Sequence, residues 1–168
     1  MFDPTIFDNL KVVLEGNLYD RDFSKRIKVI GRKDIVDLAV MSREFVMQFQ
    51  ELGNTEYPMA ELKLISTMKD FSSEMILGDP NSSGCTIYIS YYTVIKDEDV
   101  CRLINNKLDK LWNGSAIISQ ELSYIWNDQN KVKNKITLDF NRKINEDQID
   151  DIPRLIDMSI ESLQLLKD

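Results

Sequence analysis

The stretch CTIYISYYTVI, residues 85–95, decides the fold that this sequence predicts. It is rich in β-branched and aromatic side chains, and the polar loop Asp79–Gly84 precedes it, which is typical of a long strand. Because successive side chains of a strand point to opposite faces, Tyr88 and Tyr92 share one side and Tyr91 lies on the other. One face of the predicted sheet therefore carries two tyrosines.

The residues that follow this strand predict a helix and then a hairpin. Asp97 can cap a helix whose apolar series ends before Gly114. Residues 116–126 fit both strand alternation and a helical face. We favour the strand, because the polar break at 127–130 joins it to the plainly alternating residues 131–140 as a hairpin. The apolar series of the helix comprises Val100, Leu103, Ile104, Leu108 and Leu111.

The chain ends in an apolar stripe at helical spacing, which predicts a long C-terminal helix. Asn145 with Gln148 can cap this helix. Pro153 lies inside the stripe, so the helix either kinks there or begins near Asp151 after a separate turn. The stripe is formed by Ile149, Ile152, Ile156, Ile160 and Leu163.

The N-terminal residues predict a helix followed by a hairpin. Asp3–Pro4 can begin the helix, and an apolar face repeats along it until Gly16, which indicates its end. The β-branched and alternating residues 18–23 and 26–31 then favour a hairpin. Residues 34–42 favour a short helix, although a strand fits them almost as well.

Two alternating stretches and a capped helix complete this part of the chain. Residues 44–50 place three large apolar groups on one side of a strand, and residues 61–64 alternate in the same way. Thr67 and Asp70 resemble a capping box, which predicts a helix that ends near Gly78.

These elements predict an α+β fold, with a largely antiparallel sheet, helices packed on one face, an N-terminal helix and a long C-terminal helix. Residues 1–168 are expected to form a single domain. Residues 26–78 and 85–167 both give the order strand, helix, strand, strand, helix, which suggests either a pseudo-duplicated unit or a coincidence of element order. An opening helix, paired strands and later helices in a small acidic domain resemble secretion-chaperone-like modules; this resemblance of element order supplies no site residue.

Composition excludes several classes of function. The 168 residues carry 28 acidic and 21 basic side chains, for a formal net charge of -7, and no histidine. The acidic balance argues against a nucleic-acid partner, and the missing histidine removes the commonest general base and metal ligand. No apolar run approaches the roughly 18 residues of a membrane span, so we expect a cytoplasmic protein without a membrane partner. Cys85 and Cys101 are then expected to be reduced.

No catalytic or cofactor-binding motif is present in the sequence. It contains no glycine-rich phosphate loop, no Gly-x-Ser-x-Gly elbow and no Cys-x-x-Cys pair, so we predict no cofactor and favour a protein that is not an enzyme. An unfamiliar carboxylate-dependent enzyme is a remote alternative. The densest acidic cluster is better explained as a complement to a helix dipole than as a metal site. This cluster comprises Glu146, Asp147, Asp150 and Asp151.

The leading functional hypothesis is a protein-interaction module that acts through a sheet face and binds a protein partner or a second copy of itself, as in a homodimer. Tyrosine and tryptophan favour such surfaces because they combine an apolar body with a polar tip. The candidate surface comprises Tyr88, Tyr92, Tyr124 and Trp126.

The alternative hypothesis is a carrier of a small apolar ligand. A curved sheet and the C-terminal helix can enclose an apolar pocket between them. The side chains that would line this pocket are Phe45, Phe49, Tyr91 and Ile160.

Overall fold

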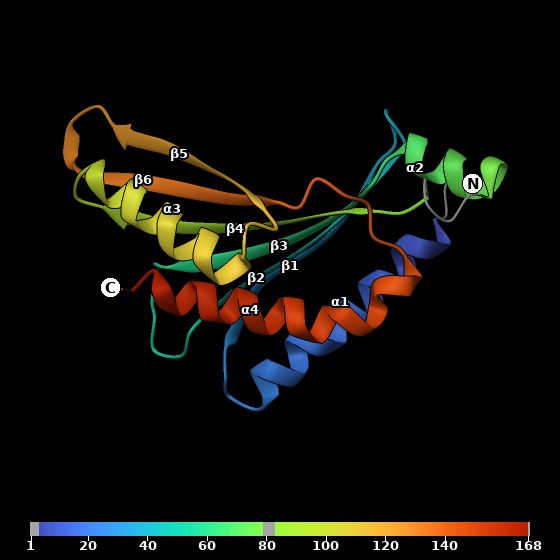
Figure 1. The fold of residues 1–168 in the computed structure, drawn as a ribbon, viewed down its shortest axis with the longest axis horizontal. Coiled ribbons are helices and arrows are strands. Elements are labelled where there is room, and N and C mark those ends of the chain that lie inside the picture. The colour runs from blue at the N-terminus through green and yellow to red at the C-terminus, as the bar shows by residue number, and fades with distance from the viewer. Residues whose placement is uncertain (1–3, 79–82, 168) are drawn as a thin grey trace.

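A computed structural model of the chain describes residues 4–78 and 83–167 (Figure 1). Its strands form one six-stranded antiparallel sheet in the order β1-β2-β3-β4-β6-β5. Because β3 pairs with β4, the sheet runs without a break through both parts of the chain. The strands are β1 (Lys28–Asp37), β2 (Ser42–Gln50), β3 (Met59–Ser66), β4 (Thr86–Ile95), β5 (Ile117–Ile125) and β6 (Asp128–Asp139).

The described residues also form four α-helices, and the three longer ones lie along one side of the sheet (Figure 1). The α+β fold, the antiparallel sheet and the two terminal helices are therefore confirmed. None of the helices in the described part of the chain is long and apolar enough to cross a membrane. The helices are α1 (Thr5–Phe23), α2 (Met68–Ser72) with its π-helical continuation η1 (Ser73–Leu77), α3 (Asp99–Trp112), the 3-10 helix η2 (Glu146–Asp151) and α4 (Ile152–Leu165).

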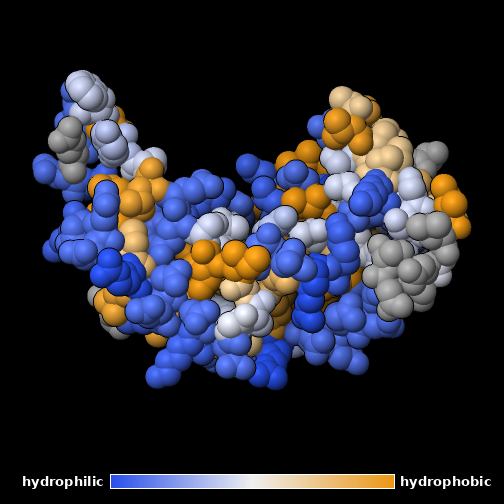
Figure 2. Space-filling model, turned by 45° about the horizontal axis from the view of Figure 1, so that its top comes forward, coloured by the Kyte–Doolittle hydropathy of each residue, from blue (hydrophilic) through white to orange (hydrophobic). Residues whose placement is uncertain are grey.

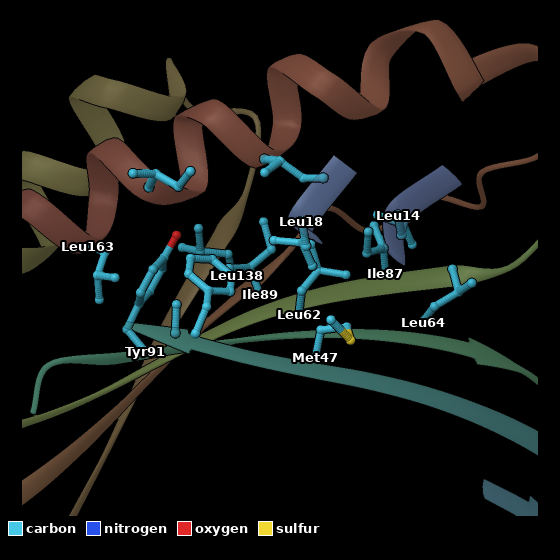
Figure 3. Packing of buried hydrophobic residues seen from close by; sticks show 14 of the residues in the cluster. Leu14, Leu18, Met47, Leu62, Leu64, Ile87, Ile89, Tyr91, Leu138 and Leu163 are labelled. Atoms are coloured by element: carbon cyan, nitrogen blue, oxygen red, sulfur yellow. The ribbon is translucent and has the colours of Figure 1, made fainter. Parts of the chain in front are cut away.

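Strand register explains why one side of the sheet is buried, and we call this side the helix face. Three cross-strand rows of apolar side chains lie on it and pack against α1, α3 and α4 (Figure 3). Burial of this many large side chains supplies the main stabilisation of the fold. The rows are Phe45, Leu64 and Ile87; Met47, Leu62, Ile89 and Leu138; and Phe49, Ala60, Tyr91 and Ile136.

Helix α1 runs past Gly16, so the predicted helix end at Gly16 and the predicted hairpin over residues 18–23 and 26–31 are wrong. The buried residues Phe7, Leu10, Leu14 and Leu18 keep helical spacing across the glycine. A glycine inside a helix costs about 1 kcal/mol, whereas burial of one leucine side chain contributes about 2 kcal/mol. The core contact of Leu18 therefore outweighs the local stop signal.

The predicted helix over residues 34–42 is also wrong, because this segment is the hairpin between β1 and β2. The Asp37 carboxylate, which lies three residues after Asp34, accepts a hydrogen bond from the Ala39 amide at 2.9 Å. It thus stabilises a turn and not a helix start. Residues 26–78 consequently give three strands before a helix, an order that differs from that of residues 85–167.

Several local predictions are confirmed. Residues 117–125 form a strand, and Thr67 and Asp70 form a reciprocal capping box at the start of α2. Asn145 and Gln148 form a second capping box, which begins η2 and not a continuous helix. The last helix begins at Ile152, with a proline in its first turn, so the proline causes no kink.

Candidate interaction surface

The second side of the sheet, which we call the open face, is the side away from α1, α3 and α4 (Figure 1). Tyr88 and Tyr92 of β4 both lie on it, and both are half-buried, whereas Tyr91 points into the core. Tyr88 lies between Lys63 of β3 and Asp139 of β6 in the strand register. The predicted side of the two tyrosines is therefore confirmed, and no long helix of the described residues covers them.

Tyr92 is held in place by a small polar network on the open face. Its phenol donates a hydrogen bond to Glu61 Oε1 at 3.4 Å, and Gln48 Nε2 donates to Glu61 Oε2 at 2.8 Å. The Lys135 ammonium lies 5.9 Å from the centre of the Tyr92 ring. Partial burial, together with the Glu61 carboxylate, raises the pKa of Tyr92 to about 12. The phenol is thus a fixed hydrogen-bond donor at neutral pH.

A hollow of about 520 Å³ opens at one end of the open face. Tyr57 and Tyr124 line it together with Val94 and Lys133. The Lys133 ammonium lies 6.0 Å from the centre of the Tyr57 ring, within reach of a cation–π contact. Sequence alternation did not identify Tyr57, because it lies in the loop before β3. The sequence feature that could have identified Tyr57 is its position two residues before Met59, the first residue of β3, because side chains two apart in an extended segment point to the same face.

The structure brings Tyr88, Tyr92 and Tyr124 to the same face, and it places Trp126 apart from them. Tyr124 is 61% exposed and borders the hollow, whereas Trp126 is 78% exposed and lies in the turn between β5 and β6. Pairing of β6 with β4 stops at Val132, so the tip of the β5–β6 hairpin extends beyond β4. Trp126 therefore extends the candidate surface only at its projecting end.

The molecule has the outline of a crescent, hollowed between two raised ends (Figure 2). Apolar side chains gather on the raised end that is formed by α2, η1 and the turn between β1 and β2. The strongly exposed apolar residues of these segments are Leu38, Val40, Met75 and Ile76.

The four residues of the alternative pocket lie together, but they form closed core. Phe45, Phe49 and Tyr91 are 0% exposed and Ile160 is 2% exposed. The Tyr91 hydroxyl points toward α4 and donates to the Ser159 carbonyl oxygen at 3.2 Å (Figure 3). Burial raises the pKa of this phenol well above its ordinary value. None of the four side chains lines a cavity described here.

A different cleft, of about 500 Å³, lies between the sheet and the C-terminal helix, and we call it the arginine cleft. The Trp112 and Phe140 rings, 5.2 Å apart between centroids, form part of its apolar lining with Met158. Arg142 and Arg154 also line it, and within the described residues neither guanidinium makes a hydrogen bond or an ion pair. The cleft therefore combines an apolar floor with the guanidinium groups of Arg142 and Arg154 and one carboxylate, that of Asp151.

Carboxylates converge at a third, smaller cavity of about 340 Å³, lined by Glu74, Glu146 and Asp147. Glu74 accepts a hydrogen bond from the Ile6 amide at 3.4 Å, and Glu146 accepts one from the Asn9 side chain. Among residues 4–78 and 83–167, no group of His, Cys, Asp and Glu has the arrangement needed to hold a metal ion. Most of the polar loop before β4, residues 79–82, lies outside the described residues.

Both cysteines are free in the structure. Cys85 is buried against the core, and Cys101 is partly exposed on α3. Burial, with Asp70 and Glu74 nearby, raises the pKa of the Cys85 thiol to about 12. A buried thiol with a raised pKa is a poor nucleophile, so Cys85 is expected to be unreactive in the folded protein.

Comparison of the chain with models of protein families, with curated proteins and with solved structures finds no match. Its function is therefore inferred from its own surfaces. Two of them have the size and chemistry of binding sites, namely the open face with its tyrosines and the arginine cleft.

Proposed function

We propose that this chain is a non-enzymatic protein-interaction module that binds a partner protein through the open face of its sheet. The position of Tyr88 and Tyr92 carries the proposal, because both rings are half-buried on a central strand that no long helix covers within residues 4–78 and 83–167. Tyrosine supplies a large apolar contact area and a polar tip, which is why it is enriched at interfaces. The contacts of Tyr92 with Glu61 and Lys135 restrict its ring before any partner binds, which lowers the entropic cost of binding.

The charges around the two tyrosines indicate a partner of mixed polarity. Lys63 Nζ lies 3.9 Å from Glu44 Oε2, and Lys135 lies opposite both Tyr92 and Glu121 in the strand register. Acidic and basic groups thus alternate, and the face has no field of a single sign that would attract a polyanion. An aromatic centre with a polar surround is typical of interfaces between proteins that also exist apart.

The proposal is tested by native mass spectrometry of the protein purified gently from its source cells. We expect a co-purifying chain with the unchanged protein and its loss with the double variant Tyr88→Ala and Tyr92→Ala. The matched control is Tyr19→Ala, which removes a tyrosine 42% exposed on α1, away from the open face. If the double variant keeps the co-purifying chain and its circular dichroism spectrum is unchanged, the open face is not the binding surface.

The arginine cleft supports a second candidate function, that of a carrier for a small amphipathic anion. Its volume lies within the range of ligand pockets, and Arg142 with Arg154 could pair with a carboxylate or phosphate group above the apolar floor. A ligand of the arginine cleft would carry an acidic head group, because Arg142 and Arg154 are positively charged. The ligand predicted from the sequence for the residues around Phe49 was purely apolar.

This second candidate is separated from the first by what co-purifies. A carrier is expected as a monomer with a discrete extra mass, which the double variant Arg142→Ala and Arg154→Ala loses. Arg102→Ala, on the exposed side of α3, is the matched control for the loss of a positive charge. A spectrum without any retained small molecule, or retention that the cleft variants do not alter, would count against the carrier.

A further inference from the structure

The two edge strands of the sheet are β1 and β5, and they differ in the features that protect an edge strand from pairing with another strand. Half of the ten residues of β1 are charged, and a register shift at Gly31 interrupts the strand. Its Val29 amide already donates to Asp22 Oδ2 at 2.9 Å, and Arg32 is ion-paired with Glu15 of α1 at 2.5 Å. Charges, a bulge and occupied backbone groups are the devices by which proteins protect an edge strand from pairing.

Strand β5 has almost none of these devices. Glu121 is the one charged residue among its nine, and Ile117, Leu122 and Tyr124 are exposed. Its backbone pairs with β6 on one side, and in the described part of the chain no strand or side chain pairs with the other side. A row of unpaired amides and carbonyls on an exposed apolar strand is a template for a further strand.

The sequence of β5 favours a second copy of the same strand. The register shift after Ser123 leaves Ile117–Ser123 as the regular segment, and Gln120 lies at its middle. Two copies arranged antiparallel about Gln120 place Ser119 of each opposite Glu121 of the other, where the hydroxyl can donate to the carboxylate. The same arrangement places Ile118 opposite Leu122 on the other side of the strand, so that two apolar pairs flank a central pair of Gln120 side chains.

Neighbouring registers are less favourable. Centring the pair on Glu121 places two carboxylates directly opposite each other, which is destabilising. Centring it on Leu122 draws the irregular backbone at Ser123–Ile125 into the ladder and so interrupts the pairing. The pairing about Gln120 is thus more complementary than the pairing about Glu121 or about Leu122.

We infer that two copies of this chain associate through β5 and form one continuous sheet with six strands from each copy. This inference goes beyond the proposed function, because the second copy pairs along the β5 edge and leaves the open face free for another protein. Residues that oppose one another in this pairing lie on the same face, so the two open faces lie on the same side of the joined sheet. The pairs of tyrosines from both copies then form one surface for a further protein.

The test is sedimentation velocity of the full chain over a wide range of concentrations, with two opposite changes at the exposed Ser119. Ser119→Glu places like charges opposite each other twice in the dimer, and we expect its dissociation constant to rise about tenfold or more. Ser119→Lys places opposite charges there, and we expect dimerisation to be kept or strengthened. Ser24→Glu and Ser24→Lys, on an exposed serine after α1, change the net charge equally and should have little effect.

Three outcomes overturn the inference. A monomer at all concentrations does so, as does a dimer that ignores both changes at Ser119. If β5 instead pairs with a strand of another protein, the isolated chain is a monomer, and an extended segment of that protein binds along β5. This result also overturns the inference of a second copy.

The proposed function is judged separately, because the Ser119 variants keep Tyr88 and Tyr92. A dimer without partner binding by the tyrosines would overturn only that proposal.

Discussion

The indole Nε1 of Trp112 donates a hydrogen bond to Ser162 Oγ at 2.8 Å, and this buried contact joins α3 to α4. Ser162→Ala is expected to leave the indole donor without a partner and to lower the free energy of unfolding by about 1–3 kcal/mol. Urea unfolding followed by circular dichroism measures this cost. In a Trp112→Phe background the same serine change should cost much less, and an equal cost in both backgrounds would contradict the role of this hydrogen bond.

Asp34 links β1 to α1 and β2 and predicts a loss of stability in acid. Partial burial alone would raise the pKa of Asp34, but hydrogen bonds from Lys11 at 2.9 Å and Arg43 at 3.0 Å lower it overall. Because its pKa is lower in the folded state, the stabilisation is present above about pH 4 and is lost as pH falls through the folded pKa. Asp34→Asn should therefore cost about 1 kcal/mol at pH 7 and progressively less as the pH falls below about 4.

Asp157 is a second carboxyl group that is expected to contribute to the loss of stability in acid. Hydrogen bonds from Arg21 and Arg26 lower the pKa of that carboxyl, so Asp157→Asn should reduce the same acid dependence. Urea midpoints between pH 7 and pH 3 would be compared for both variants and the unchanged protein. An acid dependence that neither substitution alters would show that other carboxylates control it.

The sequence predicts those parts of the fold that depend on neighbours along the chain. The two capping boxes are predictable because their partners lie three residues apart, as with Thr67 and Asp70. The side of Tyr88 and Tyr92 followed from strand alternation, which needs no knowledge of the rest of the sheet. These are the local features on which the open face depends.

Features that depend on distant partners could not be predicted in this way. Gly16 is a local stop signal, and only the packing of Leu18 in the core shows why the helix continues. Phe49 is recognisably apolar, but whether it lines a pocket or fills a core depends on how closely α4 approaches the sheet. Tyr57 lines the hollow because of the path of the irregular loop before β3, which has no periodic sequence pattern.

The two thiols should differ sharply in reactivity. Burial, reinforced by Asp70 and Glu74, raises the pKa of Cys85 to about 12, so this thiol is expected to react only when the protein unfolds. Cys101 is partly exposed, and its pKa is also raised, first by desolvation and then by Glu98 and Asp97. With Ellman's reagent at pH 8, one slow thiol should react in the folded protein. Fast labelling of the Cys101→Ser variant would contradict this assignment.

Titration of Tyr92 tests the polar network that supports the proposed interaction surface. Burial is the main cause of its pKa of about 12, and the Glu61 carboxylate adds to it. Glu61→Gln removes a neighbouring negative charge and should lower this pKa toward, but not to, the ordinary value of about 10. Tyrosine-selective NMR of the Cζ carbon, recorded from pH 8 to pH 12.5, would resolve this ring from the other five tyrosines.

The matched control for this titration is Glu121→Gln on β5. Its charge also raises the pKa of Tyr92, but it is the smallest of the causes and makes no hydrogen bond with the phenol. We therefore expect a smaller decrease with Glu121→Gln than with Glu61→Gln. Equal decreases would mean that the phenol senses only the general charge of the face. A larger decrease with Glu61→Gln would establish that Glu61 holds the ring through a direct contact before a partner arrives.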